Sequence, residues 1–431
     1  MASNVKLWEL GLIAVATTDK FSYNELNKRL DELNYDFVSE KRRKANEGNA
    51  LILYSTLLNF GQDYLKLGQV IFEVPGISAE IQYSTNLQSK LFVKASDSGV
   101  FIFYFLINFG GVSKSTDEII QMLGGRSLKF KLNEDLLTAE EVVQRVLNNL
   151  RKHSGAITVY FVTYLQKYED IGPDELYGMT NIDPTYSYAK ENLVSKILNN
   201  DASMLKNIKL YFGINGAIVM YESDPVNLLP GIINYSITDA GRDIAQYLES
   251  AGYMARISDA LNISPYIDYM VEIEPLRVEI TLLKDYDERI RTGRKSKGDI
   301  ATLKSELTEQ LDFYYSITNT RYSGVSMAMK VAAQVMGVDD LNKMMEERLR
   351  LVGESVEINH QLKLEFINVT FTYMLAAFGF ASLLMIFLFN YYRWINPTAL
   401  AISVVILTIA FLILIKVVLK IISRSEKSVE K

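Results

Sequence analysis

Few residues in this sequence are of the types that carry out catalysis. The chain of 431 residues has no Cys and only two His, His153 and His360, which lie far apart along it. This composition excludes disulfides, thiolate metal sites, iron–sulfur clusters and cysteine nucleophiles. It also excludes every Ser–His–Asp triad that does not use one of these two His residues.

One segment is similar to a phosphate-binding loop. Residues 110–116 read Gly-Gly-Val-Ser-Lys-Ser-Thr and lie between a strand-like run and a helical one. The phosphate-loop pattern Gly-x-x-x-x-Gly-Lys-Ser/Thr requires glycine where Asn108 and Ser113 stand. We therefore expect a turn at Gly110 and a helix N-cap at Ser115 instead of a nucleotide site.

The acidic pairs give no better case for an enzyme. Glu140-Glu141 and Glu346-Glu347 lie on helical stretches, where they are typical of a solvated helix face. No two carboxylates are marked out as a general acid and a general base. We predict that the chain is not an enzyme and uses no cofactor and no metal.

The C-terminal part is strongly apolar. Residues 366–392 and 394–415 contain no Asp, Glu, Lys or Arg, and Arg393 separates the two runs. A membrane-crossing helix needs about 20 apolar residues. The sequence predicts two transmembrane helices, at about 367–390 and 397–421, that form a hairpin. Its membrane-interface residues are Tyr391, Tyr392, Arg393 and Trp394 at the tip, and Lys416 and Lys420 at the other surface.

The basic residues around the hairpin predict its orientation. The tip holds one basic residue, whereas the C-terminal flank holds Lys416, Lys420, Arg424, Lys427 and Lys431. The positive-inside rule then places the C-terminus in the cytoplasm, and a hairpin returns the N-terminal region to the same side. We expect a multi-pass protein of the cell membrane with both termini cytoplasmic.

The first apolar run carries a stripe of polar and small residues. Asn368, Thr372, Leu375, Gly379 and Ser382 recur at alternating spacings of four and three, so they share one helix face. Small and hydroxyl residues let membrane helices approach closely. Two interpretations stay open: packing within the hairpin or an oligomer, and the lining of a water-filled pore.

The N-terminal half has the pattern of an α+β domain with a mixed sheet. Capping-box spacings predict helices that begin after Ser22 and Thr138. Gly213-Ile214-Asn215-Gly216 predicts a hairpin between 207–212 and 217–221. The strand-like runs are Leu10–Val15, Leu51–Leu58, Gln69–Val74, Ser89–Ala95, Val100–Phe109 and Ile157–Leu165.

The region before the membrane is predicted to be a long helical stalk. We expect Pro275 to open one helix, and a second helix at about 299–336 to end at Gly337. A third helix, capped by Asp339 or Asp340, is expected to run without a break to about residue 390. The predicted organisation is a cytoplasmic α/β domain at 1–225, a stalk at 226–365, the hairpin at 366–422 and a basic tail at 423–431.

A basic segment precedes the second stalk helix, and the helix lengths place it near the membrane surface. Basic residues there attract anionic lipid. A solvated loop, or a contact with a protein or a nucleic acid, are the alternatives. The net charge of −6 gives no reason to expect direct nucleic-acid binding. The proposed lipid-binding residues are Arg289, Arg291, Arg294, Lys295 and Lys297.

This organisation resembles that of CorA-type metal-ion transporters, in which a stalk helix continues into the first of two membrane helices. The family signature Gly-Met-Asn is replaced here by Asn390-Tyr391-Tyr392. The chain is also similar in organisation to two-helix membrane effectors of prokaryotic immune systems, such as those associated with short Argonaute proteins or CRISPR loci. That resemblance implies a cytoplasmic receptor domain and a membrane-permeabilising hairpin.

The function predicted from the sequence is that of a non-enzymatic, oligomeric membrane effector of the antiviral defence type. Its cytoplasmic domain senses a partner protein or a ligand, and its hairpin permeabilises or depolarises the membrane. The alternative is a CorA-like divalent cation channel or transporter, and the third possibility is a membrane-anchored scaffold. The expected partners are anionic lipids, further copies of the chain and a cytoplasmic sensor protein.

Overall fold

The computed structural model divides the chain into two compact units, Met1–Arg350 and Leu351–Lys431. The description that follows covers residues 2–35, 37–39, 70–81, 84–124, 128–166, 171–203, 208–221, 267–292, 301–306, 308, 323–391, 398 and 402.

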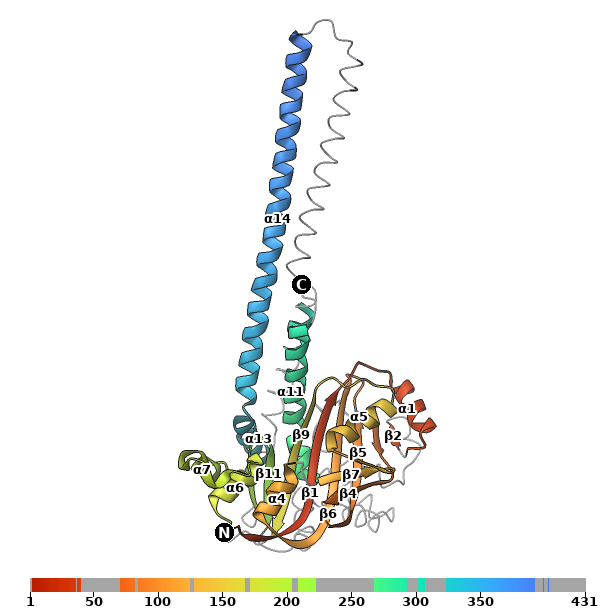
Figure 1. Cartoon of the computed structure of the whole chain (residues 1–431), viewed down its shortest axis with the longest axis vertical. Helices are drawn as coiled ribbons and strands as arrows, with labels where there is room; N and C mark the ends of the chain where they lie inside the picture. The colour runs from red at the N-terminus through yellow and green to blue at the C-terminus, as the bar shows by residue number, and fades with distance from the viewer. Residues whose placement is uncertain are drawn as a thin grey trace. The chain divides into compact units, whose positions relative to one another are not determined.

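The first unit is built on one mixed sheet of eleven strands (Figure 1). Neighbouring strands follow the order β10-β11-β9-β1-β6-β5-β4-β7-β8, while β3 pairs with β5 and β2 pairs with β3. Among the described strands, β9 and β11 pair in parallel and every other pair is antiparallel. The expectation of an α+β domain with a mixed sheet is confirmed. The strands are β1 (Asn4–Thr17), β2 (Phe37–Ser39), β3 (Val70–Glu73), β4 (Ile77–Ile81), β5 (Ser84–Ala95), β6 (Val100–Ser115), β7 (Leu128–Leu132), β8 (Asp135–Leu137), β9 (Ile157–Gln166), β10 (Ile208–Phe212) and β11 (Gly216–Tyr221).

Most strand-like runs of the sequence are strands. Five of the six lie in β1, β3, β5, β6 and β9, and the predicted hairpin is the antiparallel pair β10–β11. The sixth run, Leu51–Leu58, lies outside the described residues. These runs are apolar at nearly every position because the sheet is covered on both faces.

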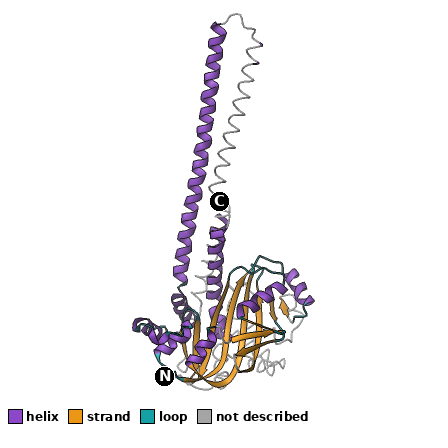
Figure 2. Cartoon of the chain, in the orientation of Figure 1, coloured by secondary structure: helices purple, strands orange, loops and turns teal. Residues whose placement is uncertain are grey.

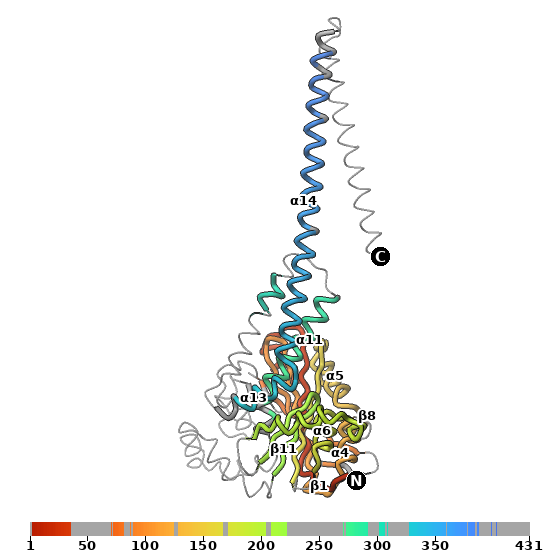
Figure 3. Tube along the Cα trace, turned by 90° about the vertical axis from the view of Figure 1, so that its left-hand side faces the viewer, coloured from red at the N-terminus to blue at the C-terminus, as the bar shows by residue number. Residues whose placement is uncertain are grey.

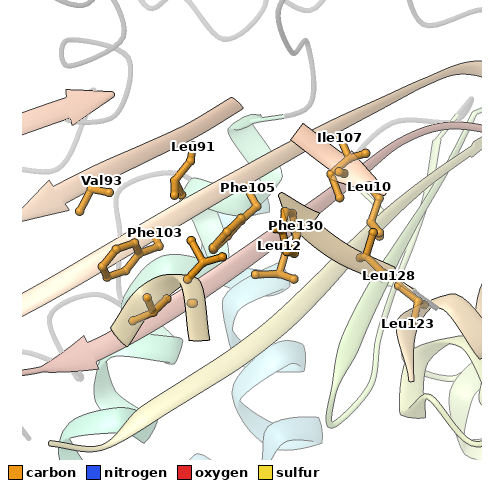
Figure 4. Packing of buried hydrophobic residues seen from close by; sticks show 14 of the residues in the cluster. Leu10, Leu12, Leu91, Val93, Phe103, Phe105, Ile107, Leu123, Leu128 and Phe130 are labelled. Carbon is orange, nitrogen blue, oxygen red and sulfur yellow. The ribbon is translucent and has the colours of Figure 1, made fainter. Parts of the chain in front are cut away.

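Helices cover the two faces of the sheet (Figure 2). In β1, Leu12 and Ala14 enter one core and Ile13 and Val15 the other, as the two-residue period of a strand requires. The first core, part of which Figure 4 displays, includes side chains of α1, α4, α5 and α6, and the second those of α11 and α13. The described helices are α1 (Tyr23–Glu32), α4 (Thr116–Leu123), α5 (Ala139–Asn149), α6 (Pro173–Asn181), the 3₁₀ turn η1 (Tyr186–Tyr188), α7 (Glu191–Leu198), α11 (Ile267–Thr292), α13 (Ser323–Met336) and α14 (Val338–Tyr391).

Two of the helix starts behave as capping boxes. Ser115 caps α4 and Thr138 caps α5, and in each the acidic residue three positions on bonds back to the cap. Helix α1 begins at Tyr23, directly after Ser22, as the spacing predicts, but the Ser22 side chain makes no cap hydrogen bond. Glu25, the expected partner, lies 3.6 Å from the Lys152 ammonium instead.

The expected turn at Gly110 is wrong, because strand β6 continues through it to Ser115. Gly110 and Gly111 have φ of 65° and 77°, and the pairing with β1 shifts register between Leu7 and Glu9. The two glycines therefore form a bulge, which needs this left-handed backbone. The indole ring of Trp8 packs against this bulge, because a Cβ added to Gly111 would lie 3.0 Å from that ring.

Pro275 does not open a helix, because it lies inside α11. A proline inside a helix removes one backbone hydrogen bond and costs about 3 kcal/mol. The preceding turns bury Met270 and Ile273 in the second core. Met270 lies so close to β1 that a Cβ on Gly11 would be 2.5 Å from its sulfur. This burial offsets the cost of Pro275, so the helix begins before it.

The predicted stop at Gly337 is confirmed, but the cap after it lies elsewhere. Gly337 has φ of 69°, and α14 begins at Val338, so Asp339 and Asp340 occupy its first turn. A carboxylate there favours the positive end of the helix dipole without being the cap.

The predicted unbroken helix is confirmed, because α14 continues to Tyr391 (Figure 3). Its 54 residues correspond to a length of about 81 Å.

Replacing Gly337 with Ala is expected to destabilise the first unit by about 1–2 kcal/mol. The reason is the left-handed backbone alone, since no atom lies within 4 Å of the position of an added Cβ. Denaturant unfolding of the purified chain measures the change. Gly337→Asn should cost less, because Asn tolerates this conformation. Equal stability of Gly337→Ala and the parent would contradict the assignment.

Candidate functional site

A buried ion pair joins helix α11 to the sheet. The Lys94 ammonium of β5 lies 2.8 Å from a carboxylate oxygen of Glu274, and both side chains are fully buried. The Tyr104 hydroxyl of β6 donates a hydrogen bond to the other oxygen of Glu274. Burial, and next the charge of Glu274, raise the pKa of Tyr104 well above its usual value. The phenol therefore stays protonated and keeps donating.

The polar contacts continue along the same face of α11. The guanidinium of Arg277 lies over the ring of Tyr160, 4.9 Å from its centre, and donates to the Val159 carbonyl at 3.3 Å. Burial lowers the pKa of Arg277 to about 10, so it remains charged at neutral pH.

One turn beyond Arg277, α11 reaches the strand ends. The hydroxyls of Thr281 and of Thr158 in β9 form a hydrogen bond with one another. Asp285 accepts a hydrogen bond from the Thr17 hydroxyl of β1 at 3.0 Å. Gly155 lies against this last pair, because its Cβ would be 2.7 Å from an oxygen of Asp285.

These contacts fix α11 in one position and register on the sheet. They offer little to a substrate, since Lys94, Glu274 and Tyr104 are satisfied by one another and closed to solvent. Among the described residues, no group of three His, Asp or Glu side chains lies where it could hold a metal ion. The network is therefore a structural connection between α11 and the sheet.

Removing one member of the buried pair is expected to destabilise the chain strongly. Lys94→Met leaves the Glu274 carboxylate without its cation, and Glu274→Leu leaves the ammonium without its anion. Each should cost about 3–5 kcal/mol in the free energy of unfolding. The double variant should recover much of this loss, because no buried charge remains. Denaturant unfolding of the four proteins measures the coupling, and simple additivity of the two losses would contradict it.

A second junction links α11 to the first turns of α14. Glu279 and Asn342 are 1% and 4% exposed, and within the described residues neither side chain has a hydrogen-bond partner. Burial raises the pKa of Glu279 to about 8, an effect that the nearby Asn342 amide opposes. Two turns further on, Asp287 of α11 forms an ion pair with Arg348 of α14. From the first contact to the second, the residue numbers rise on both helices, so α11 and α14 are parallel here.

The predicted polar stripe lies on the exposed part of α14. Asn368, Thr372, Gly379 and Ser382 all lie in the helix, on one face. The hydroxyls of Thr372 and Ser382 each donate to the backbone carbonyl four residues earlier, both at 2.8 Å. Thr370, which lies off the stripe, does the same. The hydroxyls are thus satisfied within the helix, whereas the amide of Asn368 has no hydrogen-bond partner among the described residues.

Two of the five proposed lipid-binding residues fall on the end of α11. Arg289 pairs with Glu306 at 3.1 Å and lies over the ring of Tyr286, and Arg291 pairs with Asp287 at 2.8 Å. Arg294, Lys295 and Lys297 lie outside the described residues. The structure thus gives these two arginines partners within the protein.

Of the predicted membrane-interface residues, Tyr391 is the last residue of α14. The others, Tyr392, Arg393, Trp394, Lys416 and Lys420, lie outside the described residues.

The sequence reasoning missed both junctions of α11. One signal was present: Lys94 interrupts the apolar run of β5, and Glu274, Arg277, Thr281 and Asp285 recur at helical spacing. A charge inside a buried strand implies a buried counter-charge. The identity of its partner, 180 positions along the chain, was not readable from the pattern.

Within the described residues, one helix is long and apolar enough to cross a membrane: α14, over Val338–Leu383. The apolar window that gives this result is fully exposed. No family profile and no curated protein matches the sequence.

Proposed function

We propose that this chain is a non-enzymatic membrane effector that assembles into an oligomer and permeabilises the bilayer. In this proposal the α+β domain is cytoplasmic and receives a signal from a partner protein or a ligand. Helix α14 and the apolar run at 394–415 form a two-helix hairpin, and both termini lie in the cytoplasm. Antiviral defence by membrane depolarisation is the role that we assign to it.

The observation that carries the proposal is the character of α14. The helix begins within the folded unit, has an apolar C-terminal half, and exposes a stripe on which the Asn368 amide has no hydrogen-bond partner among the described residues. An amide in hydrocarbon without a partner costs several kcal/mol. A second copy of the helix supplies that partner, since two Asn side chains can both donate and accept. Assembly through the stripe therefore follows from its chemistry.

The stripe also favours a pore over a plain anchor. In a plain anchor, an Asn, a Thr, a Gly and a Ser on one face would serve only the packing of the hairpin. The same face, turned toward the axis of an oligomer, supplies small and weakly polar groups to a water-filled path. It offers no charged ring, so the path would select weakly among ions.

Leakage from anionic liposomes that carry the purified full chain tests this function. The proposal expects dye and ion leakage with and without Mg²⁺, and none from a chain that ends at Asn359. Selective, Mg²⁺-dependent cation flux would instead identify the CorA-like channel. Absence of leakage from the intact chain, also after addition of cell extract that contains its natural partners, would leave a membrane-anchored scaffold.

Replacing Asn368 with Leu is expected to weaken assembly and leakage about tenfold. The loss corresponds to one interhelical hydrogen bond of about 1–2 kcal/mol in a membrane. Thr372→Val, on the same stripe, should reduce leakage by a smaller factor. Thr370→Val is the matched control, because its hydroxyl makes the same backbone bond off the stripe. Equal effects of the two Thr variants would contradict a role for this face.

The basic segment is expected to bind anionic lipid mainly through its second half. Changing Arg294, Lys295 and Lys297 to Gln should reduce binding to anionic vesicles in a salt-dependent way, at about 1 kcal/mol per charge. Changing Arg289 and Arg291 should do less, because both pair within the protein. Vesicle co-sedimentation measures both. Unchanged binding of the triple variant would remove lipid from the proposal.

A further inference from the structure

Glu279 lies on the side of α11 that faces away from the sheet. Glu274 and Arg277 mark the sheet-facing side through their contacts with Lys94 and Val159. Five residues on from Glu274, at about 100° per residue, Glu279 is turned by about 140°. Asp287, on the same far side, pairs with Arg348, which confirms that this side meets the first turns of α14.

The pair Glu279–Asn342 is polar and nearly closed to solvent, and neither side chain is satisfied. Both oxygens of Glu279 and both amide atoms of Asn342 lack a hydrogen-bond partner in the described part of the chain. An ionised carboxylate only accepts, so it can use the amide N–H of Asn342 but leaves the amide oxygen unbonded. A neutral carboxyl both donates and accepts, so it can form two reciprocal hydrogen bonds with that amide. The hydrogen bonds between Glu279 and Asn342 can therefore both form only when the Glu279 carboxyl is neutral.

Among the described residues, no charged group contributes to the shifted pKa of Glu279, which burial raises and the Asn342 amide lowers. On its own helix, the phenol of Tyr286 is a titratable group whose pKa is raised first by burial and then by nearby carboxylates, with Glu279 contributing least. The Lys94 ammonium, on the sheet side, is bound to Glu274. The charged residues of α13 and of the first two turns of α14 are exposed: Lys330, Asp339, Asp340, Lys343 and Glu346.

Burial accordingly raises the pKa of Glu279 from 4.5 to about 8. Between these two values the folded chain holds a proton that the unfolded chain releases. The stabilisation is complete below pH 4.5 and is lost as the pH rises through about 8. This interval includes the pH of most cells.

We propose that Glu279 is a proton-operated latch that holds the base of α14 on α11. In the protonated state the Glu279 carboxyl and the Asn342 amide bond to one another and fix the first turns of α14. Loss of the proton to water leaves a buried anion, and this part of α14 separates from α11. Gly337, at the start of the helix, permits the change in direction. The idea that this latch controls permeability rests on the proposed function. The latch itself is independent of that function.

The absence of Cys makes this movement measurable by spin labelling. Labels on Lys284→Cys of α11 and Lys343→Cys of α14 occupy exposed positions, one on each of the two helices that meet at the junction. Pulsed electron spin resonance on the full chain in lipid nanodiscs gives the distribution of distances between them. We expect one narrow distribution at about pH 6 and a longer or broader one at about pH 9.5, with a midpoint near pH 8.

Glu279→Gln, which bonds like the neutral acid, should keep the narrow distribution at both pH values. Glu279→Leu provides a second uncharged variant that should also show no pH response. Glu346→Gln, which removes an exposed carboxylate of α14, should respond as the parent does. A parent distribution that does not change with pH, or a Glu279→Gln protein that still responds, would overturn the latch. Leakage from liposomes at both pH values tests the pore separately, because the spin-label distances do not depend on it.

Discussion

The attachment of α11 to the sheet is the constraint on which the rest of the first unit depends. The helix buries apolar side chains, but its position is set by a few polar contacts, above all the bonds of Glu274 to Lys94 and Tyr104. Apolar packing alone tolerates small shifts, whereas a buried ion pair tolerates almost none, because any displacement leaves a charge unsatisfied. The far side of α11 is thereby held in place, and on that side the first turns of α14 pack. The start of the long helix thus takes its position from the sheet through α11.

The strands and the long helix were readable from the sequence because each has a local pattern. Strands β1, β6 and β9 are continuous apolar runs, as a sheet covered on both faces requires, and α14 lacks any strong breaker. The errors occurred where a local rule met a tertiary contact. Pro275 normally begins a helix, but the packing of Met270 over Gly11 extends α11 beyond it. Gly110 and Gly111 normally mark a turn, but the pairing of β6 with β1 continues past them.

The candidate site was less predictable than the fold. The stripe on α14 depends on spacing within one helix, so the amino-acid sequence is enough to find it. The two junctions of α11 join residues 61 to 268 positions apart, and no pattern in one sequence specifies which distant residues meet. Glu279 shows this most clearly: in sequence it resembles any helical glutamate, and only its burial against Asn342 distinguishes it.

For a chain that acts as proposed, the internal bonding of the hydroxyls on α14 bears on the order of membrane insertion and assembly. Thr370, Thr372 and Ser382 each bond to a carbonyl of their own helix, so none of them needs a neighbour when the helix first enters a bilayer. Insertion can therefore precede assembly, and single copies can diffuse in the membrane at little polar cost. In the described part of α14, the Asn368 amide, close to the start of the apolar run, is the group that joins one copy to another in the proposed assembly. Such a helix suits a population of separate subunits that gathers at a late step.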